Sequence, residues 1–292
     1  MTKAKIEFKK QREIGEIITD TFAFIRQEFK NYFGTIIKMV GPYLLIAIAG
    51  IGCYLYSLGS LVNIQMLESN FSETDLIFLI IGVIFLLVGG IATYALSYSV
   101  TLNYIKSYEN NNGVVIQEEI RKGVRDSFWG IIGLGVLVFI MMSVGIMLCC
   151  FPGIYLWVPL TLSFSLLVFR NLSVTDAISD SFSLIKNEWW MTFITMFVVW
   201  LIMAIASYAF SMPAIIYSWV KMGISAGEGD FANGDFFIKD PVYIALNLVS
   251  YFFQYFLNLV TLITSVLIYF NLNEKKNFTG TFEKIDSLGS NS

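Results

Sequence analysis

Histidine is absent from this chain of 292 residues, and cysteine occurs only three times. Without histidine the chain lacks the side chain that most often acts as a general base near neutral pH and that most often binds metal ions. The cysteines Cys53, Cys149 and Cys150 lie in or beside apolar runs with no CxxC spacing, which indicates buried, reduced side chains. We therefore expect no metal and no cofactor.

Charge is also scarce, because 14% of the residues are charged and 56% are hydrophobic, with a mean hydropathy of +0.68. Soluble domains carry about 25% charged residues, since a surface in water has to be covered by polar groups. A chain this apolar is typical of a protein whose solvent is a lipid bilayer. Its apolar runs are continuous and too long for the roughly ten-residue alternating strands of a transmembrane barrel.

Apolar runs close to the length of about 20 residues that a helix needs to cross a bilayer occur six times. The fourth run is short but uncharged, and the Phe151-Pro152-Gly153 turn separates it from the third. We predict an all-α polytopic helical bundle that forms one transmembrane domain over 1–272, followed by a flexible cytoplasmic tail over 273–292. The six predicted spans are 32–58, 76–104, 127–151, 153–169, 189–211 and 242–272.

Lysine and arginine mark one side of the predicted membrane domain. Sixteen of the 19 Lys and Arg residues lie on this side. They are found before the first span, in the segment between spans two and three, in the segment between spans four and five, and after the sixth span. Lys221 and Lys239 fall in the loops of the other side, and Lys38 lies inside the first span. Because basic residues collect in cytoplasmic loops, both termini are predicted to be cytoplasmic.

Three segments that enter spans from this cytoplasmic side have the spacing of amphipathic helices, over about 12–30, 116–126 and 174–187. Their apolar stripes are Ile14, Ile18, Phe22, Ile25 and Phe29; Ile116, Ile120, Val124 and Phe128; and Val174, Ile178, Phe182, Ile185 and Trp189. Such helices can lie in the membrane interface, or their apolar faces can pack on the bundle. The two alternatives are compatible, and we predict three cytoplasmic interfacial helices.

The first and third of these segments are similar in sequence. Glu16–Phe33 and Asp176–Phe193 align without gaps and are identical at six of eighteen positions, including Glu28/Glu188. A fainter third copy covers Gln117–Trp129. Because every copy enters a span from the cytoplasm, we predict a parallel internal repeat of an interfacial helix and a two-span hairpin. Such a repeat either surrounds a shared site or duplicates a membrane-embedding unit that has no site.

Polar residues recur every three or four positions along two predicted spans. In the second span, Gly89, Thr93, Ser97 and Thr101 form such a row, which is typical of close helix packing. The row in the last span consists of Asn247, Ser250, Gln254, Asn258, Thr261 and Ser265. One hypothesis for this second row is a polar groove for a lipid headgroup or a solute, and the other is hydrogen bonding between helices.

No catalytic motif is recognisable in the sequence, which has no phosphate-binding loop, GxSxG, HExxH or paired acids. No Asp or Glu lies in the middle of a predicted span, where proton relays place them. We therefore predict no catalytic residue and a non-enzymatic protein that organises or binds membrane lipids or partner membrane proteins, including itself, and no nucleic acid. The alternatives are a transporter or lipid-handling protein that uses the polar row of the last span, and an intramembrane enzyme.

Three segments resemble a group of bacterial six-span proteins related to the membrane domain of glycerophosphoryl diester phosphodiesterases. They are Phe151–Leu160 (FPGIYLWVPL), Asp180–Trp190 (DSFSLIKNEWW) and Leu267–Leu272 (LIYFNL). In those phosphodiesterases catalysis belongs to a separate soluble barrel, which needs histidine and clustered acids that this chain does not contain. The resemblance implies a stand-alone membrane domain in the bacterial cytoplasmic (inner) membrane.

Overall fold

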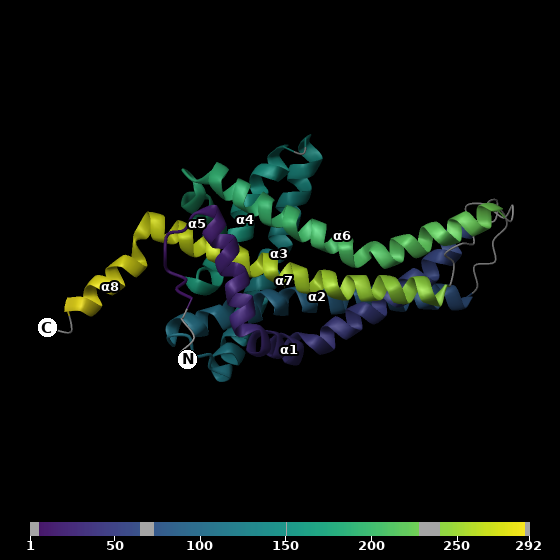
Figure 1. The fold of residues 1–292 in the computed structure, drawn as a ribbon, viewed down its shortest axis with the longest axis horizontal. Coiled ribbons are helices and arrows are strands. Elements are labelled where there is room, and N and C mark those ends of the chain that lie inside the picture. The colour runs from purple at the N-terminus through teal and green to yellow at the C-terminus, as the bar shows by residue number, and fades with distance from the viewer. Residues whose placement is uncertain (1–5, 65–72, 150, 228–239, 290–292) are drawn as a thin grey trace. The chain divides into compact units, whose positions relative to one another are not determined.

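The computed structural model describes residues 6–64, 73–149, 151–227 and 240–289. This described part is built from helices and contains no strand (Figure 1). In chain order the helices are α1 (Ile14–Ile64), α2 (Glu73–Asn110), α3 (Gln117–Cys149), α4 (Phe151–Phe169), α5 (Val174–Ile185), α6 (Trp189–Gly227), α7 (Pro241–Asn277) and α8 (Thr279–Gly289). Six of them, α1 to α4, α6 and α7, are long and apolar enough to cross a membrane. The all-α class and the six predicted spans are confirmed.

Two of the three predicted interfacial segments are continuous with the span that follows them. Residues 14–30 and 117–126 are the first turns of α1 and α3, whereas the third segment forms the separate helix α5. The break after α5 has a local cause, because the backbone N–H of Glu188 donates to the carbonyl of Ile185, three residues back, at 2.9 Å. That bond closes a tighter turn than an α-helix has.

The tail that we predicted to be flexible is helical over its described part. α7 continues past residue 272, the chain turns at Phe278 with a φ of 51°, and α8 follows. The Glu274 carboxylate accepts hydrogen bonds from the backbone N–H groups of Gly280 at 2.7 Å and Thr281 at 2.9 Å. These N–H groups would otherwise be unpaired at the start of a helix, so Glu274 caps α8. The polar composition of this segment led to the prediction of a loose tail. Composition alone does not show that Glu274 caps a helix.

The chain groups into two compact units, which we describe separately. Unit 1 contains residues 1–39, 95–201 and 259–292, and unit 2 contains 40–94 and 202–258. The helices α1, α2, α6 and α7 each contribute a segment to both units. The helices α3, α4, α5 and α8 belong to unit 1.

Three apolar helix segments are enclosed in unit 1: residues 95–105 of α2, 158–168 of α4 and 259–274 of α7. Nearly every side chain in these segments is buried, so their polar residues also face protein. Aromatic rings pack beside them. The ring centroid of Phe24 lies 5.3 Å from that of Phe8 and 5.4 Å from that of Tyr108, and both pairs have edge-to-face geometry. The buried hydroxyl of Tyr32 forms a hydrogen bond of 2.8 Å with Thr101, a member of the predicted polar row of the second span.

The first turns of α1 bury a different face from the apolar stripe that we identified. Phe22 and Phe29 of that stripe are 45% and 60% exposed, whereas Ile17, Thr21 and Phe24 are buried. Thr21 is accommodated there because its hydroxyl forms a 3.2 Å hydrogen bond with Thr264 of α7. The helix therefore packs on unit 1 with one flank and leaves aromatic side chains of the stripe uncovered.

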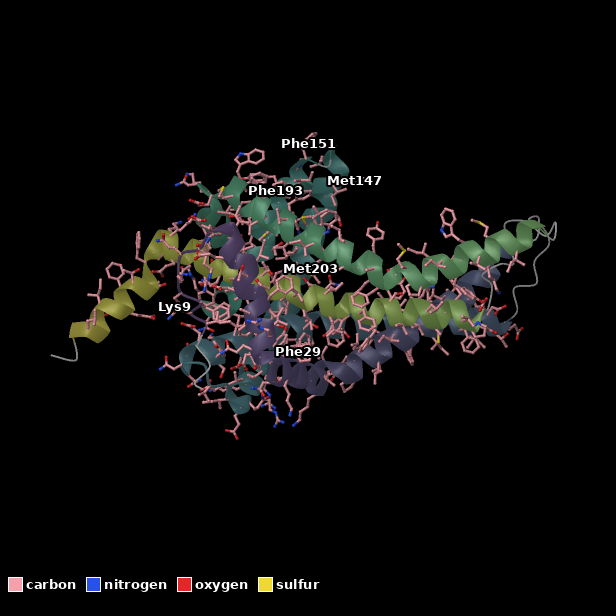
Figure 2. The ribbon with its side chains drawn as sticks, in the orientation of Figure 1. Lys9, Phe29, Met147, Phe151, Phe193 and Met203 are labelled. Carbon is pink, nitrogen blue, oxygen red and sulfur yellow. The ribbon has the colours of Figure 1, made fainter. Side chains whose placement is uncertain are left out.

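The turn between α3 and α4 also presents apolar side chains outward. Met147 is 92% exposed and Phe151 is 83% exposed, and Figure 2 shows both at the tip of this hairpin. The two helices approach closely just below the tip, because a Cβ added at Gly145 would lie 3.0 Å from the Cα of Gly153. We predicted a turn at Phe151-Pro152-Gly153, but these residues form the first turn of α4, where proline is tolerated because its missing N–H would have no partner within the helix. The close approach of Gly145 and Gly153 holds the two helices together.

In unit 2, α1 and α2 approach each other closely where glycines face the neighbouring backbone. A Cβ added at Gly89 would lie 2.7 Å from the backbone nitrogen of Ala47, and one at Gly50 would lie 2.7 Å from that of Leu86. A Cβ at the adjacent Gly90, in contrast, would meet nothing within 4 Å. Gly89 begins the predicted polar row of the second span, so this end of the row serves close helix packing.

Candidate functional site

The polar row predicted along the last span lies on α7 and divides between the two units. Asn247, Ser250, Gln254 and Asn258 belong to unit 2, and Thr261 and Ser265 belong to unit 1. Ser250 and Ser265 are buried, Asn247, Gln254 and Thr261 are half-buried, and Asn258 is exposed. The six positions therefore do not share one environment.

Two members of the row make hydrogen bonds to the neighbouring helix α6 of unit 2. The Ser250 hydroxyl donates to the carbonyl of Phe210 at 3.0 Å, and the Gln254 amide donates to the hydroxyl of Ser211 at 3.2 Å. Asn247 instead donates to the carbonyl of Tyr243 within α7, at 2.9 Å. For Ser250 and Gln254 these contacts favour packing between helices, and the groove hypothesis stays a prediction.

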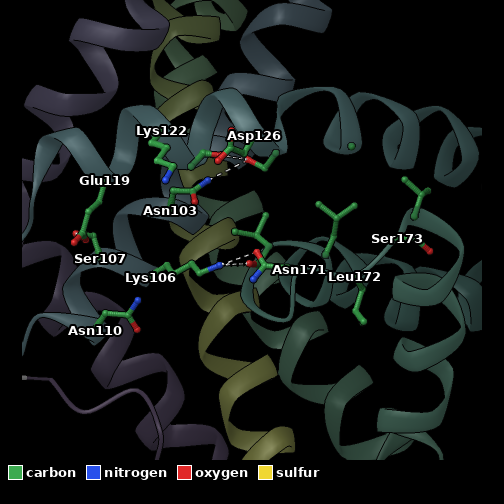
Figure 3. A pocket seen from close by; sticks show the side chains of 16 residues that line it. Asn103, Lys106, Ser107, Asn110, Glu119, Lys122, Asp126, Asn171, Leu172 and Ser173 are labelled. Atoms are coloured by element: carbon green, nitrogen blue, oxygen red, sulfur yellow. Dashed lines mark hydrogen bonds between the residues drawn. The ribbon is translucent and has the colours of Figure 1, made fainter.

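A pocket of about 750 Å³ opens in unit 1 where the end of α2, the start of α3 and the junction of α4 and α5 meet. None of its lining residues belongs to the predicted polar rows. Figure 3 shows charged and amide side chains from α2 and α3 on one side of it and Leu172 on the other. The polar lining includes Asn103, Ser107, Asn110, Glu119, Lys122 and Asp126, and the apolar lining includes Leu167, Leu172 and Val174.

The polar side of the pocket is shaped by the turn that joins α2 to α3. Asn112 and Gly113 have φ values of 52° and 91°, a conformation that Asn and Gly tolerate better than other residues. The Ser107 hydroxyl accepts from the backbone N–H of Ile116 at 3.1 Å and donates to the Glu119 carboxylate at 2.7 Å. These bonds hold the start of α3 against the end of α2.

Asn103 links α2 to α3 in the wall of the pocket. Its side-chain amide donates to the carbonyl of Ser99 at 2.8 Å. It also donates to the hydroxyl of Ser127 at 3.1 Å (Figure 3). A Cβ at Gly123 would overlap the side-chain oxygen of Asn103, so a larger residue there would displace this hydrogen-bonded side chain. Glycine at this position therefore leaves room for Asn103 between α2 and α3.

Lys106 joins the end of α2 to the end of α4. Its ammonium group donates to the carbonyl of Val168 at 2.6 Å and to the amide oxygen of Asn171 at 3.1 Å (Figure 3). Asn171 has a φ of 51°, which turns the chain out of α4 toward α5. A cation is favourable at this place because the last carbonyl groups of a helix carry partial negative charge.

Lys122 and Asp126 are the charged residues of the pocket that stay available to a ligand. Both are exposed side chains of α3 that line the pocket. Within the described ranges, neither forms an ion pair or a side-chain hydrogen bond, unlike Lys106 and Glu119. The pocket can therefore offer one cation and one anion to a bound molecule.

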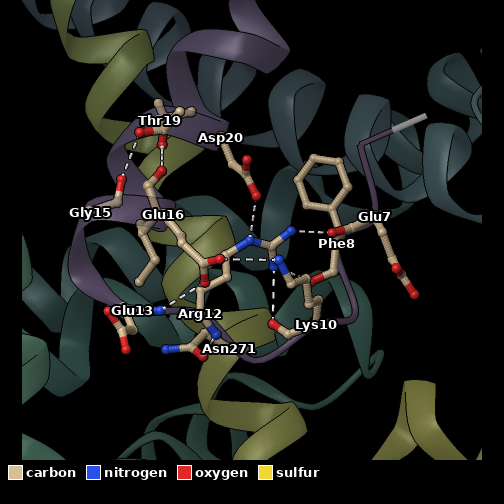
Figure 4. Close-up of polar contacts among 12 residues, drawn as sticks. Glu7, Phe8, Lys10, Arg12, Glu13, Gly15, Glu16, Thr19, Asp20 and Asn271 are labelled. Carbon is tan, nitrogen blue, oxygen red and sulfur yellow. Dashed lines mark hydrogen bonds and ion pairs between the residues drawn. The ribbon is translucent and has the colours of Figure 1, made fainter. Parts of the chain in front are cut away.

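A second polar cluster, around Arg12, is satisfied internally (Figure 4). The buried guanidinium donates to the Asp20 carboxylate at 2.8 Å and to the carbonyls of Phe8 at 2.8 Å and Lys10 at 3.0 Å. The backbone N–H of Arg12 donates to the side chain of Asn271 on α7 at 2.7 Å. A group with all these partners serves structure, because little of its binding capacity is left for a ligand.

In unit 2, Asp240 precedes α7 and accepts hydrogen bonds from the backbone N–H groups of Val242 and Tyr243 at 2.9 and 3.3 Å. It also pairs with Lys221 and accepts from the Tyr217 hydroxyl at 2.8 Å. Burial raises the pKa of Asp240, but these hydrogen bonds outweigh it and lower the pKa to about 2. The cluster fixes the start of α7 against α6.

Sequence reasoning missed the pocket because its walls come from three segments that are separate along the chain. A signal was present in α3, where Lys122 and Asp126 stand four residues apart, off the apolar stripe of that segment. The sequence does not show that the end of α2 and the junction of α4 and α5 complete the pocket. Among the described residues, no group of three or more His, Cys, Asp and Glu side chains could hold a metal ion.

Comparison of the chain with protein-family models, with curated proteins and with solved structures finds no match. The resemblance to the phosphodiesterase membrane domain therefore stays a prediction from the sequence.

Proposed function

We propose that this chain is a non-enzymatic multi-pass protein of the bacterial cytoplasmic membrane that binds a phospholipid in the pocket of unit 1. The observation that carries the proposal is that the pocket lining combines charged and amide side chains of α2 and α3 with the apolar side chains of Leu167, Leu172 and Val174, which lie with Asn171 and Ser173 around the junction of α4 and α5. A phospholipid likewise combines a polar headgroup with apolar acyl chains. The volume of about 750 Å³ lies in the range of about 300–1,000 Å³ that is typical of ligand sites.

Exposed aromatic side chains favour a position of the pocket near the lipid headgroups. Phe22 and Phe29 of α1, Trp129 of α3 and Trp190 of α6 are between 45% and 75% exposed. Aromatic side chains of membrane proteins gather at the interface between membrane and water. Trp129 precedes Gly130, which lines the pocket, so this exposed tryptophan and the pocket share one region of α3.

The distribution of Lys and Arg supports cytoplasmic termini and a cytoplasmic position of the pocket. We expect Asn112→Cys, in the turn between α2 and α3, to be shielded from an impermeant thiol reagent in intact cells. Thr74→Cys, at the start of α2, should be labelled. Both variants are made in a background without Cys53, Cys149 and Cys150. The opposite labelling pattern would contradict the orientation.

Lipid binding in the pocket is tested with Gly130→Leu. A Cβ at Gly130 would lie 3.5 Å from Leu167, an ordinary contact, so leucine can enter the apolar side of the pocket without displacing backbone. We expect native mass spectrometry of the full chain in mild detergent to show bound phospholipid for the original protein and little for this variant. Gly34→Leu is the control, because a Cβ there meets nothing within 4 Å. Equal lipid binding by both variants would refute the proposal.

The alternative of a transporter or lipid-handling protein rests on the polar row of α7. The hydrogen bonds of Ser250 and Gln254 to α6 favour a packing role for that row instead. The resemblance to a membrane domain without its catalytic barrel also agrees with a non-enzymatic role. The proposal therefore places binding in unit 1 and helix packing in unit 2.

A further inference from the structure

We infer that the pocket selects a zwitterionic phospholipid whose headgroup carries a phosphate and a protonated primary amine. This inference rests on the proposed function, because it names the lipid class that the same pocket binds. Its basis is the hydrogen bonding of the charged groups that line the pocket, because Lys106 and Glu119 are held by neutral protein groups and Lys122 and Asp126 have no such partner among the described residues.

Four charged side chains line the pocket, two of each sign: Lys106, Lys122, Glu119 and Asp126. One cation and one anion among them are already held by protein. Lys106 donates to a helix-end carbonyl and to Asn171, and Glu119 accepts from Ser107 at 2.7 Å and from Asn111 at 2.8 Å. All of these partners are neutral, so Lys106 and Glu119 keep their charges, which sum to zero. The charged groups of the lining without a hydrogen-bond partner among the described residues are Lys122 and Asp126, whose charges also sum to zero.

The spacing of Lys122 and Asp126 suits a headgroup that carries both charges. Residues four positions apart lie on the same face of a helix, with Cβ atoms about 5–6 Å apart. Side chains at this spacing can meet two charged groups that are joined by a short linker. In the proposed complex the ammonium of Lys122 binds the phosphate, and the carboxylate of Asp126 accepts hydrogen bonds from the amine.

Other headgroups satisfy only part of this arrangement. A headgroup with a phosphate and no amine leaves Asp126 beside a second negative charge, which is repulsive at short range. A quaternary amine has no N–H group, so it can attract the carboxylate but cannot donate hydrogen bonds to it. The order of affinity expected from these contacts is primary amine first, quaternary amine second and anionic headgroup last.

The inference is tested by titrating the purified full chain, in mild detergent, with short-chain phosphatidylethanolamine, phosphatidylcholine and phosphatidylglycerol. Asp126→Asn should weaken phosphatidylethanolamine binding about three- to fivefold, the effect of losing a solvent-exposed charge pair, and should not weaken phosphatidylglycerol binding. Lys122→Gln should weaken binding of all three lipids. Glu118→Gln, on the same helix but outside the pocket lining, is the matched control and should change none of them.

The outcomes separate this inference from the proposed function. If Gly130→Leu removes binding of all three lipids while Asp126→Asn leaves phosphatidylethanolamine affinity unchanged, the pocket binds lipid and the headgroup selectivity is refuted. Tighter binding of phosphatidylglycerol than of phosphatidylethanolamine by the original protein refutes it as well. If Gly130→Leu changes nothing, the proposed function fails and the inference fails with it.

Discussion

Unit 1 and unit 2 each contain a segment of α1 and of α2, and these two helices make different contacts in the two units. Unit 1 buries charged groups together with their partners, such as Arg12 with Asp20 and Glu28 with the hydroxyl of Tyr104. In unit 2, α1 and α2 meet backbone to backbone through Gly50 and Gly89. Burying a charge is favourable only when it is paired, whereas small residues favour association between helices in lipid.

The helix α7 lies in two different environments, one in each unit. Along α7, residues 259–274 are enclosed by protein on nearly all sides, whereas Val249, Tyr251 and Phe252 in unit 2 are 39% to 54% exposed. Exposed apolar side chains are favourable where the solvent is lipid. Unit 1 should therefore respond most strongly to the loss of polar groups, and unit 2 to the addition of volume between helices.

The largest effect is expected from Arg12→Ala in unit 1. The substitution leaves Asp20 without its cation and removes the donors to Phe8 and Lys10, so we expect about 3 kcal/mol of destabilisation, measured as thermal unfolding in detergent. Lys10→Ala is the control, because its ion pair with Glu16 is half-exposed and should be worth less than about 1 kcal/mol. Equal losses for the two variants would show that burial does not distinguish these pairs.

A smaller effect, about 2 kcal/mol, is expected from Gly89→Ala in unit 2, where the new Cβ meets the backbone of Ala47. The control is Gly90→Ala, which adds the same methyl group into open space and should be neutral or slightly stabilising, since alanine favours helix more than glycine does. If both variants unfold at the same temperature, close packing of α1 on α2 does not stabilise unit 2.

Gln254→Leu should cost about 1 kcal/mol, because it removes the hydrogen bond to Ser211 between α7 and α6. Asn258→Leu is the matched comparison, since Asn258 is exposed and leucine there should be neutral. Thermal stability is measured together with bound lipid by native mass spectrometry. A Gln254→Leu protein of unchanged stability that has lost a bound lipid would revive the groove hypothesis for the polar row.

An effect of similar size concerns pH and Asp240. Its pKa in the folded protein, about 2, lies below the ordinary value of 3.8, so the ionised form stabilises the fold above about pH 4. That contribution is lost as the pH falls from about 4 to about 2. Allowing for screening by solvent, we expect about 1 kcal/mol. The stability difference between the original protein and Asp240→Asn should shrink over this pH range, and a constant difference would contradict the assignment.

The helices were predictable from the sequence to a greater degree than the contacts between them. A helix that crosses a bilayer needs a continuous apolar run, and such runs can be seen in the sequence. Each of the six predicted spans therefore corresponds to a helix that is long and apolar enough to cross a membrane. Amphipathic spacing led to Phe22 and Phe29, but the buried flank of α1 includes Thr21 and Glu28, whose partners Thr264 and Tyr104 lie far along the chain. A polar side chain is buried when its partner is near, and the partner cannot be read from local spacing.

The internal repeat stays a prediction, although burial agrees at several aligned positions. Thr21 and its counterpart Ser181 are both buried. Glu28 and Glu188 each accept a hydrogen bond from another helix, from Tyr104 at 3.0 Å and from Lys275 at 2.8 Å. The sequence has a glutamate at the same aligned position of both copies, Glu28 and Glu188. This shared acid was a signal that the two positions face protein.

The contacts of Arg12 also bear on the order in which the protein can be completed during synthesis. The segment before α1 leaves the ribosome first, but its backbone is held by Asn271, and Lys9 pairs with Glu283 at 2.6 Å. Both partners are translated near the end of the chain. These two contacts can form only after α7 and α8 have been translated, whereas the contacts of Phe8 with Phe24 and Tyr108 can form earlier. Truncation just before α7 should therefore loosen the segment before α1 and make it more sensitive to proteases.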